Sequence, residues 1–384
     1  MLKVGVIGCG NCGNQVTVAV TKVMEDVPVL AINSSSKDLA TLPSTIPQKL
    51  IGDGKGSGKN RDESKEFLSK EIMKLLSDES FKTFLLDLDV VFIVSSTGGG
   101  TGSGISLLLS GIIKKAVPGV YVIPVGIMPA VKKEGESSHG NSLEYLKELY
   151  EVLGPSTTYM LYDNDKFAKE GSIAMMEKVN ASVATDINIL RCYFNLSTKY
   201  ASIDEKDMLN IIRTPGRLFV ASLFDVKEKD LDDETLEDKL ITEIKNNAHV
   251  ELQRDLIVHR SGIIVMLSPT VLSQFNTHVE NVQKFVGSPV EEFEHIYVND
   301  DRKLPNNVFL ILSGLSKVND RIRKANDRIL EIEDARKQQE DDSELDIDLI
   351  GAIKDSKTYH NAEVDANANI DIAGIFADFG VNIK

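Results

Sequence analysis

The feature that most restricts the fold of this chain is a glycine-rich run that directly follows an apolar segment. Residues 90–94 read Val-Val-Phe-Ile-Val, and the next ten, Ser95 to Gly104, contain five glycines. A second apolar segment, Ile105 to Ile113, follows at once. Glycine lets backbone N–H groups close on an anion, and a helix N-terminus adds a favourable dipole. The pattern therefore predicts a buried strand, a phosphate-binding loop and a helix, because a flexible linker would not lie between two apolar elements.

Length and charge limit the class of protein. The chain has 384 residues, a net charge of −15 and three cysteines. Its length favours two domains, since one core rarely grows beyond about 250–300 residues. The negative charge argues against strong direct nucleic-acid binding, which needs a basic surface. No run approaches the roughly 20 apolar residues of a membrane span, residues 1–10 resemble a strand rather than a signal peptide, and the few cysteines fit a reducing cytoplasm.

A second glycine-containing loop, Gly8 to Gly13, follows the apolar segment at residues 2–8 and matches two motifs with other functions. Cys9-Gly10-Asn11-Cys12 is formally a C-x-x-C motif, but zinc or redox chemistry would need a second pair or suitably placed histidines. The third cysteine is Cys192 and the six histidines are scattered, so we expect no metal site. Gly8 to Gly13 also matches the G-x-G-x-x-G dinucleotide fingerprint. A Rossmann oxidoreductase would further need an acidic residue after the second strand, where this chain has Asn33 to Ser36.

Apolar and amphipathic segments alternate over the first part of the chain. We expect strands at 2–8, 27–33, 90–94, 120–125 and 158–162, with helical segments between them. Such alternation predicts a parallel sheet covered on both faces. Residues 1–171 should therefore form a doubly wound α/β domain, with its ligand at the carboxyl ends of the strands.

The second part of the chain has a different pattern. An amphipathic run without Pro or Gly begins at Ser172 and predicts a long central helix over 172–200. A second, smaller α+β domain is expected over 201–315, and a C-terminal helix with an apolar stripe over 316–339. Residues 340–384 carry eleven Asp/Glu against three Lys, which predicts an acidic tail that is disordered alone. Its apolar patch at 370–379 is typical of segments that fold on a partner.

The run from Gly98 to Gly104 is also the signature of the tubulin/FtsZ superfamily, which the chain resembles over about residues 2–316. The resemblance implies a GTPase that binds GTP or GDP with Mg²⁺ and polymerises head to tail into dynamic filaments. The C-terminal helix and acidic tail make the chain most similar to the TubZ group, the plasmid- and phage-borne filaments that move DNA. That likeness implies a bacterial, cytoplasmic protein whose gene lies on a plasmid or phage.

The resemblance also assigns nucleotide contacts to six loops and the central helix. The segments that resemble these loops, in chain order from first to sixth, are Gly10–Gln15, Ala31–Ser34, Gly52–Asn60, Gly98–Gly104, Pro129–Gly135 and Tyr162–Lys166. The resemblance implies that the first loop contacts the phosphates and base, the third senses the γ-phosphate, and the fifth lies near the ribose. Asn164 and Asn180 would read the guanine edge, which favours GTP over ATP. The family's division proteins carry an Arg a few residues beyond Glu134, where this chain has Ser137-Ser138-His139. The implied contacts are Gly10, Asn11, Cys12, Asn14, Gln15, Asn33, Gly54, Gly58, Lys59, Asn60, Gly98, Gly99, Gly100, Thr101, Gly102, Ser103, Glu134, Asn164 and Asn180.

The catalytic residues are expected outside that pocket. The segment from Ser202 to Asp207 is similar to the family's synergy loop, which implies that Asp204 and Asp207 orient the attacking water in the next subunit's pocket. Asp204 also fits an ordinary helix N-cap. The pocket loops are rich in Gly, Ser, Thr and Asn but offer no obvious water-positioning acid, so hydrolysis should need a neighbour.

Two alternative functions remain, and the binding partner of the acidic tail is not identified. The chain could be a division protein of the FtsZ type, with the 370–379 patch docking to a membrane anchor, or a structural relative that does not hydrolyse GTP. The tail's net charge of −8 predicts a basic partner, either a DNA-binding adaptor or the adjacent filament subunit.

Overall fold

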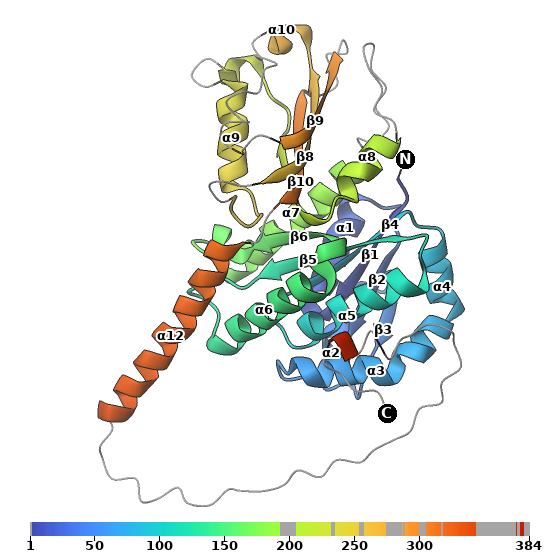
Figure 1. The fold of residues 1–384 in the computed structure, drawn as a ribbon, viewed down its shortest axis with the longest axis vertical. Coiled ribbons are helices and arrows are strands. Elements are labelled where there is room, and N and C mark those ends of the chain that lie inside the picture. The colour runs from blue at the N-terminus through green and yellow to red at the C-terminus, as the bar shows by residue number, and fades with distance from the viewer. Residues whose placement is uncertain are drawn as a thin grey trace, which may run out of the picture.

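A computed structural model describes residues 2–192, 205–231, 235–252, 257–273, 286, 289–298, 305–315, 318–342, 374 and 377–379. One ten-stranded sheet, ordered β3-β2-β1-β4-β5-β6-β7-β10-β8-β9, runs through both parts of the molecule (Figure 1). Its strands are β1 (Val4–Cys9), β2 (Val29–Asn33), β3 (Gln48–Leu50), β4 (Val90–Ser96), β5 (Tyr121–Met128), β6 (Thr158–Asp163), β7 (Gly216–Leu223), β8 (Val258–Leu267), β9 (Pro289–Val298) and β10 (Asn307–Leu315).

The first six strands are all parallel and form the N-terminal domain. Their order places β1 beside β4, with β2 and β3 on one side and β5 and β6 on the other. The chain therefore reverses its direction of travel across the sheet between β1 and β4, and this is where doubly wound folds bind ligands. The predicted doubly wound α/β architecture is confirmed. Its helices are α1 (Gly10–Val23), α2 (Ser36–Leu39), α3 (Arg61–Ser77), α4 (Glu79–Leu86), α5 (Thr101–Ala116), α6 (Glu136–Glu148) and the short η1 (Leu149–Leu153), η2 (Gly154–Ser156) and η3 (Asn164–Phe167).

Two apolar layers hold these helices against opposite faces of the sheet. Val16 of α1 belongs to one buried cluster with Val183 of α7 (Ser172–Cys192). Leu68 of α3, Leu108 of α5 and Leu146 of α6 belong to the other. Every residue of α5 from Thr101 to Ile113 is buried, so this helix is enclosed on all sides. Over this stretch it carries only Gly, Ser, Thr, Leu and Ile, without a charged residue, as such a position requires.

The second part of the molecule extends the same sheet. β7 pairs with β6 in parallel, with Thr158 opposite Gly216, and β10 lies antiparallel between β7 and β8. A third apolar cluster joins this part of the sheet to one of its helices, through residues such as Phe219 and Leu240. The helices described here are α8 (Glu205–Ile212), η5 (Glu228–Leu231), α9 (Leu236–Asn246), α10 (Pro269–Leu272) and α12 (Asn319–Asp342).

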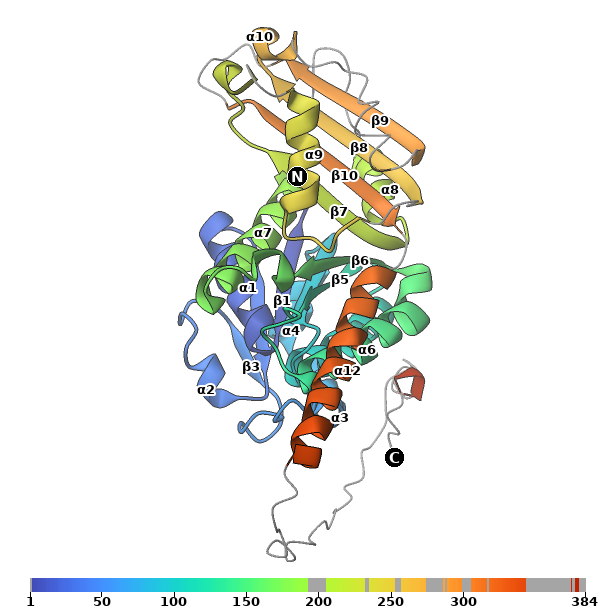
Figure 2. The same cartoon turned by 90° about the vertical axis from the view of Figure 1, so that its left-hand side faces the viewer.

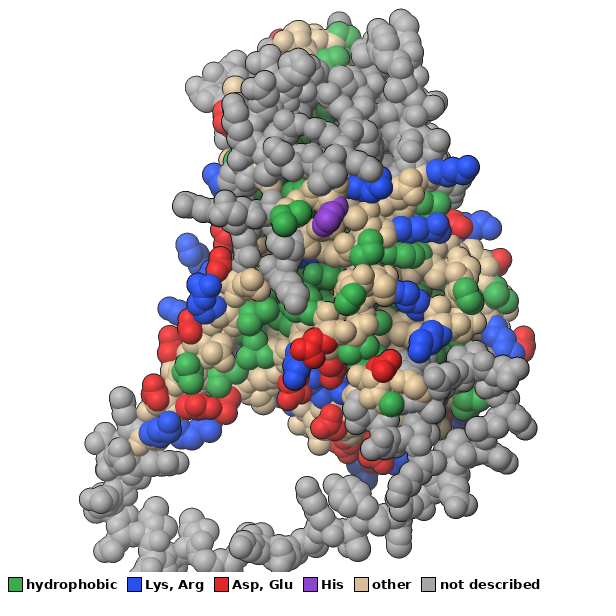
Figure 3. Space-filling view, viewed as in Figure 1, with side chains coloured by type: hydrophobic (Ala, Val, Ile, Leu, Met, Phe, Trp, Pro, Cys, Tyr) green, Lys and Arg blue, Asp and Glu red, His purple; other side chains and the backbone are tan. Residues whose placement is uncertain are grey.

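The helix α12 extends from the junction of the two parts along α6 (Figures 1 and 2). An ion pair of 2.7 Å joins Arg336 Nη2 to Glu136 Oε2 on α6. Its surface carries interspersed acidic and basic side chains (Figure 3), among them the pair Arg328–Glu331 at 3.0 Å. Residues 193–204 of the predicted central helix and synergy loop, and most of the predicted tail, lie outside the described residues. Within the described ranges, no helix is long and apolar enough to cross a membrane.

Candidate nucleotide site

A cavity of about 410 Å³ opens at the carboxyl ends of β1, β2 and β4. Four loops that are far apart in sequence meet there, because parallel strands end at the same edge of a sheet. The residues that line it are Cys9, Gly10, Asn11, Cys12, Asn33, Ser35, Asp38, Lys55, Gly56, Ser57, Gly58, Lys59, Ser96, Gly99, Gly100, Thr101 and Gly102.

The electrostatics of the cavity favour an anion. The helices α1 and α5 both begin in its lining, and neither has a side-chain hydrogen bond at its N-cap residue, Cys9 or Gly100. Their first N–H groups are therefore left for a ligand, and both helix dipoles favour negative charge at this point. Lys55 and Lys59 add positive charge to the lining, against the single carboxylate of Asp38.

Close backbone contacts explain the glycines of the first and fourth loops. Gly10 has a φ of +69°, and a Cβ at this residue would lie 2.7 Å from the Gly102 nitrogen. A Cβ at Gly100 would lie 2.4 Å from Ser57 Oγ and 2.6 Å from Lys59 Cα. At Gly99, which also lines the cavity, a Cβ would meet no atom within 4 Å. The first and third loops thus close on the fourth, whereas Gly99 leaves space for a ligand.

Hydroxyl groups join three of the loops at the base of the cavity. Thr101 Oγ1 lies 2.6 Å from Ser34 Oγ and 3.2 Å from Ser57 Oγ, so the second, third and fourth loops share one side chain. Asn33 accepts a hydrogen bond from the Ser34 nitrogen at 2.8 Å and donates one to Asp38 Oδ2 at 3.3 Å. The side chain of Asn33 therefore shapes its own loop and holds the one carboxylate of the lining.

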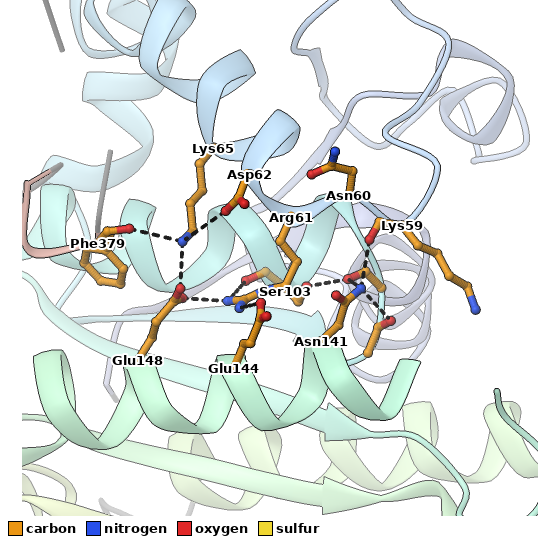
Figure 4. Close-up of polar contacts among 12 residues, drawn as sticks. Lys59, Asn60, Arg61, Asp62, Lys65, Ser103, Asn141, Glu144, Glu148 and Phe379 are labelled. Carbon is orange, nitrogen blue, oxygen red and sulfur yellow. Dashed lines mark hydrogen bonds and ion pairs between the residues drawn. The ribbon is translucent and has the colours of Figure 1, made fainter. Parts of the chain in front are cut away.

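Two residues of α6 that the sequence did not reveal, Asn141 and Ser138, hold the third and fourth loops together. Figure 4 shows Asn141 beside the third loop. Asn141 Nδ2 donates to the carbonyl oxygens of Lys59 at 2.9 Å and Gly99 at 3.1 Å. Lys59, whose φ is +65°, donates through Nζ to Ser138 Oγ at 2.8 Å. Ser138 lies where an Arg was expected from the family's division proteins. These residues thus support the loops from behind.

The structure brings ten of the predicted contact residues into the lining and places the other nine outside it. Those in the lining are Gly10, Asn11, Cys12, Asn33, Gly58, Lys59, Gly99, Gly100, Thr101 and Gly102. Those outside it are Asn14, Gln15, Gly54, Asn60, Gly98, Ser103, Glu134, Asn164 and Asn180.

Several residues outside the lining have defined roles. Asn60 caps α3 by accepting a hydrogen bond from the Glu63 nitrogen at 3.1 Å, and Glu134 accepts one from the Ala130 nitrogen at 3.1 Å. Both polar side-chain atoms of Asn14 are buried without a hydrogen-bond partner in the described part of the chain. A buried carboxamide of this kind normally has a partner, so Asn14 fits a ligand or water at the base of the site.

The predicted base-recognition residues lie on neighbouring elements. Asn164 is buried and begins η3, directly after β6, at the same edge of the sheet as the cavity. Asn180 is half-buried on α7, and α7 packs against η3. No hydrogen bond joins either of them to the cavity lining in the described residues, and their roles stay predictions.

The cysteine pair is held in the thiol form. Burial raises the pKa of Cys9 far above its usual range and raises the pKa of Cys12 to about 12, with a smaller contribution from the Glu134 carboxylate. Both groups are therefore protonated at neutral pH, whereas a nucleophile or metal ligand must be a thiolate. Across the described ranges, no group of three or more His, Cys, Asp or Glu side chains could hold a metal ion.

The helix that carries Asp207 lies away from this cavity. Asp204 falls outside the described residues. The structure describes the backbone of Asp207, on α8, but not its side chain. In both ribbon views α8 lies near the start of β1, at the opposite end of the sheet from the cavity (Figures 1 and 2). Asp38 gives the lining a carboxylate that the sequence did not reveal, because it is five residues beyond the end of β2.

This arrangement of glycine loops and helix N-termini is suited to phosphate and lies where doubly wound domains bind their ligands. Residues 3–171 match the family model described as Tubulin/FtsZ family, GTPase domain. This region is therefore similar to a Tubulin/FtsZ-family GTPase domain, the resemblance that the sequence predicted.

Part of the chain is similar to individual proteins from more than one branch of this family. The tubulin-like protein CetZ of Pyrococcus horikoshii is 26% identical over 219 residues, which cover 55% of this chain and 58% of that protein. The tubulin-like protein TubZ of Clostridium botulinum C phage is 26% identical over 224 residues, 57% of this chain and 59% of that protein. The chain thus spans less than two thirds of the curated relatives it matches.

A solved structure extends the likeness to the second part of the fold. A GTPγS-form protofilament of TubZ from Bacillus thuringiensis serovar israelensis has a TM-score of 0.70. The alignment covers 89% of this chain and 94% of that chain, at 17% identity. At this identity the comparison shows that the fold is shared.

Proposed function

We propose that the protein binds GTP in this cavity, hydrolyses it to GDP and polymerises head to tail into filaments. The observation that carries the proposal is the pair of helix N-termini without side-chain caps, α1 and α5, that begin in a cavity also lined by Lys55 and Lys59. A site of this kind suits a polyphosphate. Mg²⁺ would enter with the nucleotide and would supply positive charge that neutralises part of the phosphate charge.

The predicted contact residues then have separate roles. The N–H groups at the starts of α1 and α5 would bind the phosphates, and Gly58 and Lys59 of the third loop would face the γ-phosphate. To do so, Lys59 Nζ would exchange its hydrogen bond to Ser138 for a charge-assisted bond to phosphate. Asn164 and Asn180 would recognise guanine, and Glu134 would lie near the ribose.

We further propose that Asp204 and Asp207 complete the pocket of the next subunit. The cavity and α8 lie at opposite ends of the domain, so head-to-tail stacking would bring α8 of one subunit to the cavity of another. The protofilament named for the Bacillus thuringiensis TubZ supports assembly of this kind. Asp38, already in the lining, is the competing candidate for the carboxylate that orients water.

A mixing experiment separates these two sources of the carboxylate. If hydrolysis occurs in trans, GTP turnover per subunit should rise with protein concentration, and Asp207→Ala should bind GTP but turn it over slowly. Adding a nucleotide-binding-deficient variant should restore activity, since it supplies an intact Asp207 to the Asp207→Ala subunit's pocket. Asn210→Ala, an exposed position on the same helix, serves as the control. Turnover that is independent of concentration, and is lost in Asp38→Asn instead, would refute hydrolysis in trans.

We also propose that the filament segregates or positions plasmid or phage DNA, with the acidic tail contacting a basic adaptor. The similarity to phage TubZ and the tail's net charge of −8 support this role. A small replicon carrying the gene and its flanking sequence should be lost at each division when Asp207→Ala replaces the wild type. Equal retention of the replicon, or a defect in cell division instead, would favour the FtsZ-type alternative.

A further inference from the structure

Two helices face each other with opposite charges beside the nucleotide loops (Figure 4). Arg61 and Lys65 lie one turn apart on α3, and Glu144 and Glu148 lie one turn apart on α6. Arg61 binds Glu148 Oε2 through Nη2 at 2.6 Å and Glu144 Oε2 through Nη1 at 3.0 Å. Lys65 Nζ binds the other oxygen of Glu148, Oε1, at 2.7 Å. Glu148 is therefore shared between the two cations.

Both cations are almost fully enclosed. The Arg61 side chain is 3% exposed and that of Lys65 is 6% exposed. A buried ammonium is costly unless its charge and its N–H donors are satisfied. Besides Glu148, and Asp62 at 3.9 Å, Lys65 Nζ has one further partner in the described structure, the carbonyl oxygen of Phe379 at 3.1 Å.

Phe379 comes from the other end of the chain and is docked at this point. Its side chain is buried and belongs to the same apolar cluster as Leu68 and Ile72 of α3 and Leu149, directly after α6. The two residues before it, Ala377 and Asp378, are exposed. The contact is thus specific to one side chain and one carbonyl group, 314 residues from Lys65.

The docking contact is connected to the nucleotide loops through Arg61. Arg61 is the first residue of α3 and directly follows Lys59 and Asn60 of the third loop. Its Nη2 also donates to the carbonyl oxygen of Ser103 at 3.2 Å, in the first turn of α5. The carboxylate that binds Lys65 therefore also holds Arg61, and with it the start of α3, against the fourth loop.

We propose that the surface between α3 and α6 is a docking site for the protein's own C-terminal segment, and that docking slows nucleotide release. The docked Phe379 carbonyl holds Lys65 on Glu148, and Glu148 holds Arg61 on the first turn of α5. The third and fourth loops are thereby kept closed around the cavity. By linkage, bound nucleotide strengthens docking by the factor by which docking raises the equilibrium affinity for nucleotide. The coupling rests on the proposed nucleotide site, whereas the docking itself does not.

Docking can be measured directly because the chain contains no tryptophan. In the full-length protein, Phe379→Trp introduces a single fluorophore at the docked position, and Asp378→Trp introduces one at the exposed neighbour. We expect blue-shifted emission and several-fold weaker quenching by acrylamide for Phe379→Trp. Adding Lys65→Met should bring its quenching towards that of Asp378→Trp. Equal quenching of the two single variants, together with a negative result in the second measurement, would overturn the docking site.

The second measurement follows the chemical reactivity of Lys65, and its reference is the wild-type protein with Phe379 intact. Lys65 should be slow to react with an acetylating reagent in the full-length protein, and several-fold faster in Phe379→Ala. The exposed Lys70 on the same helix should react at one rate throughout, and Asp378→Ala should behave like the wild type. If Lys65 reacts at the same rate with and without Phe379, the segment does not cover it and the proposal fails.

Nucleotide release tests the coupling. Below the concentration of assembly, release of a fluorescent GDP analogue should be about 5-fold faster from Phe379→Ala than from the wild type or Asp378→Ala, the lower end of typical coupling. Release at one rate from all three proteins would overturn the coupling. If no nucleotide binds at all, the proposed function fails, while quenching and Lys65 reactivity still decide whether the segment docks.

Discussion

The cavity at the edge of the sheet and the junction between the two parts of the molecule are built in different ways. Six of the residues that line the cavity are glycines, and the lining includes the first residues of α1 and α5, so backbone groups are central to it. The junction is held by buried polar side chains. Tyr162 Oη on β6 donates to Asp186 Oδ2 on α7 at 2.7 Å, and His249 Nε2 lies 2.9 Å from the same oxygen.

This difference decides what a sequence reveals. A site made of backbone groups needs glycine wherever two segments touch, so it leaves a recognisable run such as Gly98 to Gly104. A network of buried side chains draws single residues from distant positions, and each of them is unremarkable alone. Asp186 is 24 residues from Tyr162 and 63 from His249. The aromatic rings of Tyr162 and His249 are stacked with their centres 4.3 Å apart, and nothing in the sequence pairs them.

The largest expected effect tests the backbone-built site. Gly99→Val places a side chain where the protein leaves open space in the cavity, so GTP affinity should fall by at least about 100-fold, or roughly 2.7 kcal/mol. The fold should persist, because no protein atom lies within 4 Å of the added Cβ. Gly100→Val is a poorer test, since its Cβ would strike Ser57 and Lys59. Calorimetry should measure the affinity and thermal unfolding the stability.

The matched control for this change is Gly119→Val. Gly119 is exposed, precedes β5 at the amino ends of the strands, and likewise has no atom within 4 Å of an added Cβ. It should bind GTP as the wild type does. Unchanged affinity in a folded Gly99→Val protein would remove the fourth loop from the site and with it the contrast between cavity and junction.

The junction should give the opposite result, a loss of stability with nucleotide affinity preserved. Asp186→Ala leaves the buried Tyr162 hydroxyl and His249 without their shared acceptor, which should cost about 2–4 kcal/mol of unfolding free energy. Asp186→Asn keeps an acceptor oxygen and should cost less. Denaturant unfolding measures both.

An exposed carboxylate paired with the same helix provides the comparison. Asp26 binds Arg191 of α7, and its side chain is 71% exposed, so Asp26→Ala should cost less than about 1 kcal/mol. If Asp186→Ala and Asp26→Ala destabilise the protein equally, the buried network does not hold the junction. If Asp186→Ala instead abolishes GTP binding, the two regions are not separable.

The sequence predicts the N-terminal domain well because each of its elements carries its own signal. The strand expected at 90–94 is β4, Val90–Ser96, and three of the glycines after it, Gly99, Gly100 and Gly102, line the cavity. The continuity of the sheet is not predictable in this way, because β7 pairs with a strand more than fifty residues earlier. Arg217 on β7 is fully buried and donates to the Val250 carbonyl at 2.7 Å, in an environment that no local pattern announces.

The same reason explains which site residues the sequence missed. Asn141 and Ser138 lie on a helix that resembles any amphipathic segment, and only folding places them behind Lys59 and Gly99. Arg61 and Lys65 are ordinary charges of an ordinary helix until Glu148 and Phe379 reach them. The role of each of these side chains depends on its hydrogen-bond or ion-pair partner, and only the tertiary structure brings that partner into contact.

The smallest expected effect concerns a buried histidine in the support behind the cavity. His139, next to Ser138 on α6, must donate through Nε2 to the Val131 carbonyl at 3.1 Å, since a carbonyl only accepts. Burial lowers the pKa of His139; Arg321 lowers it further, while the Val131 hydrogen bond and Glu134 act in the opposite direction. The unfolded chain, with a histidine pKa of about 6.5, therefore binds the proton first as the solution is acidified.

Stability should accordingly fall as the pH drops below about 6.5 and stop falling from this source once the folded pKa is passed. His139→Gln removes the titrating group, so the wild type should lose more unfolding free energy than the variant between pH 7 and pH 5. His259→Gln makes the same change at an exposed position and serves as the control. Other groups titrate in this range, but they do so in all three proteins and cancel in the difference. If unfolding free energy changes with pH in the same way for the wild type and His139→Gln, the folded protein accommodates the protonated ring of His139. The side-chain contacts of α6 with the cavity loops would then be less rigid than the junction.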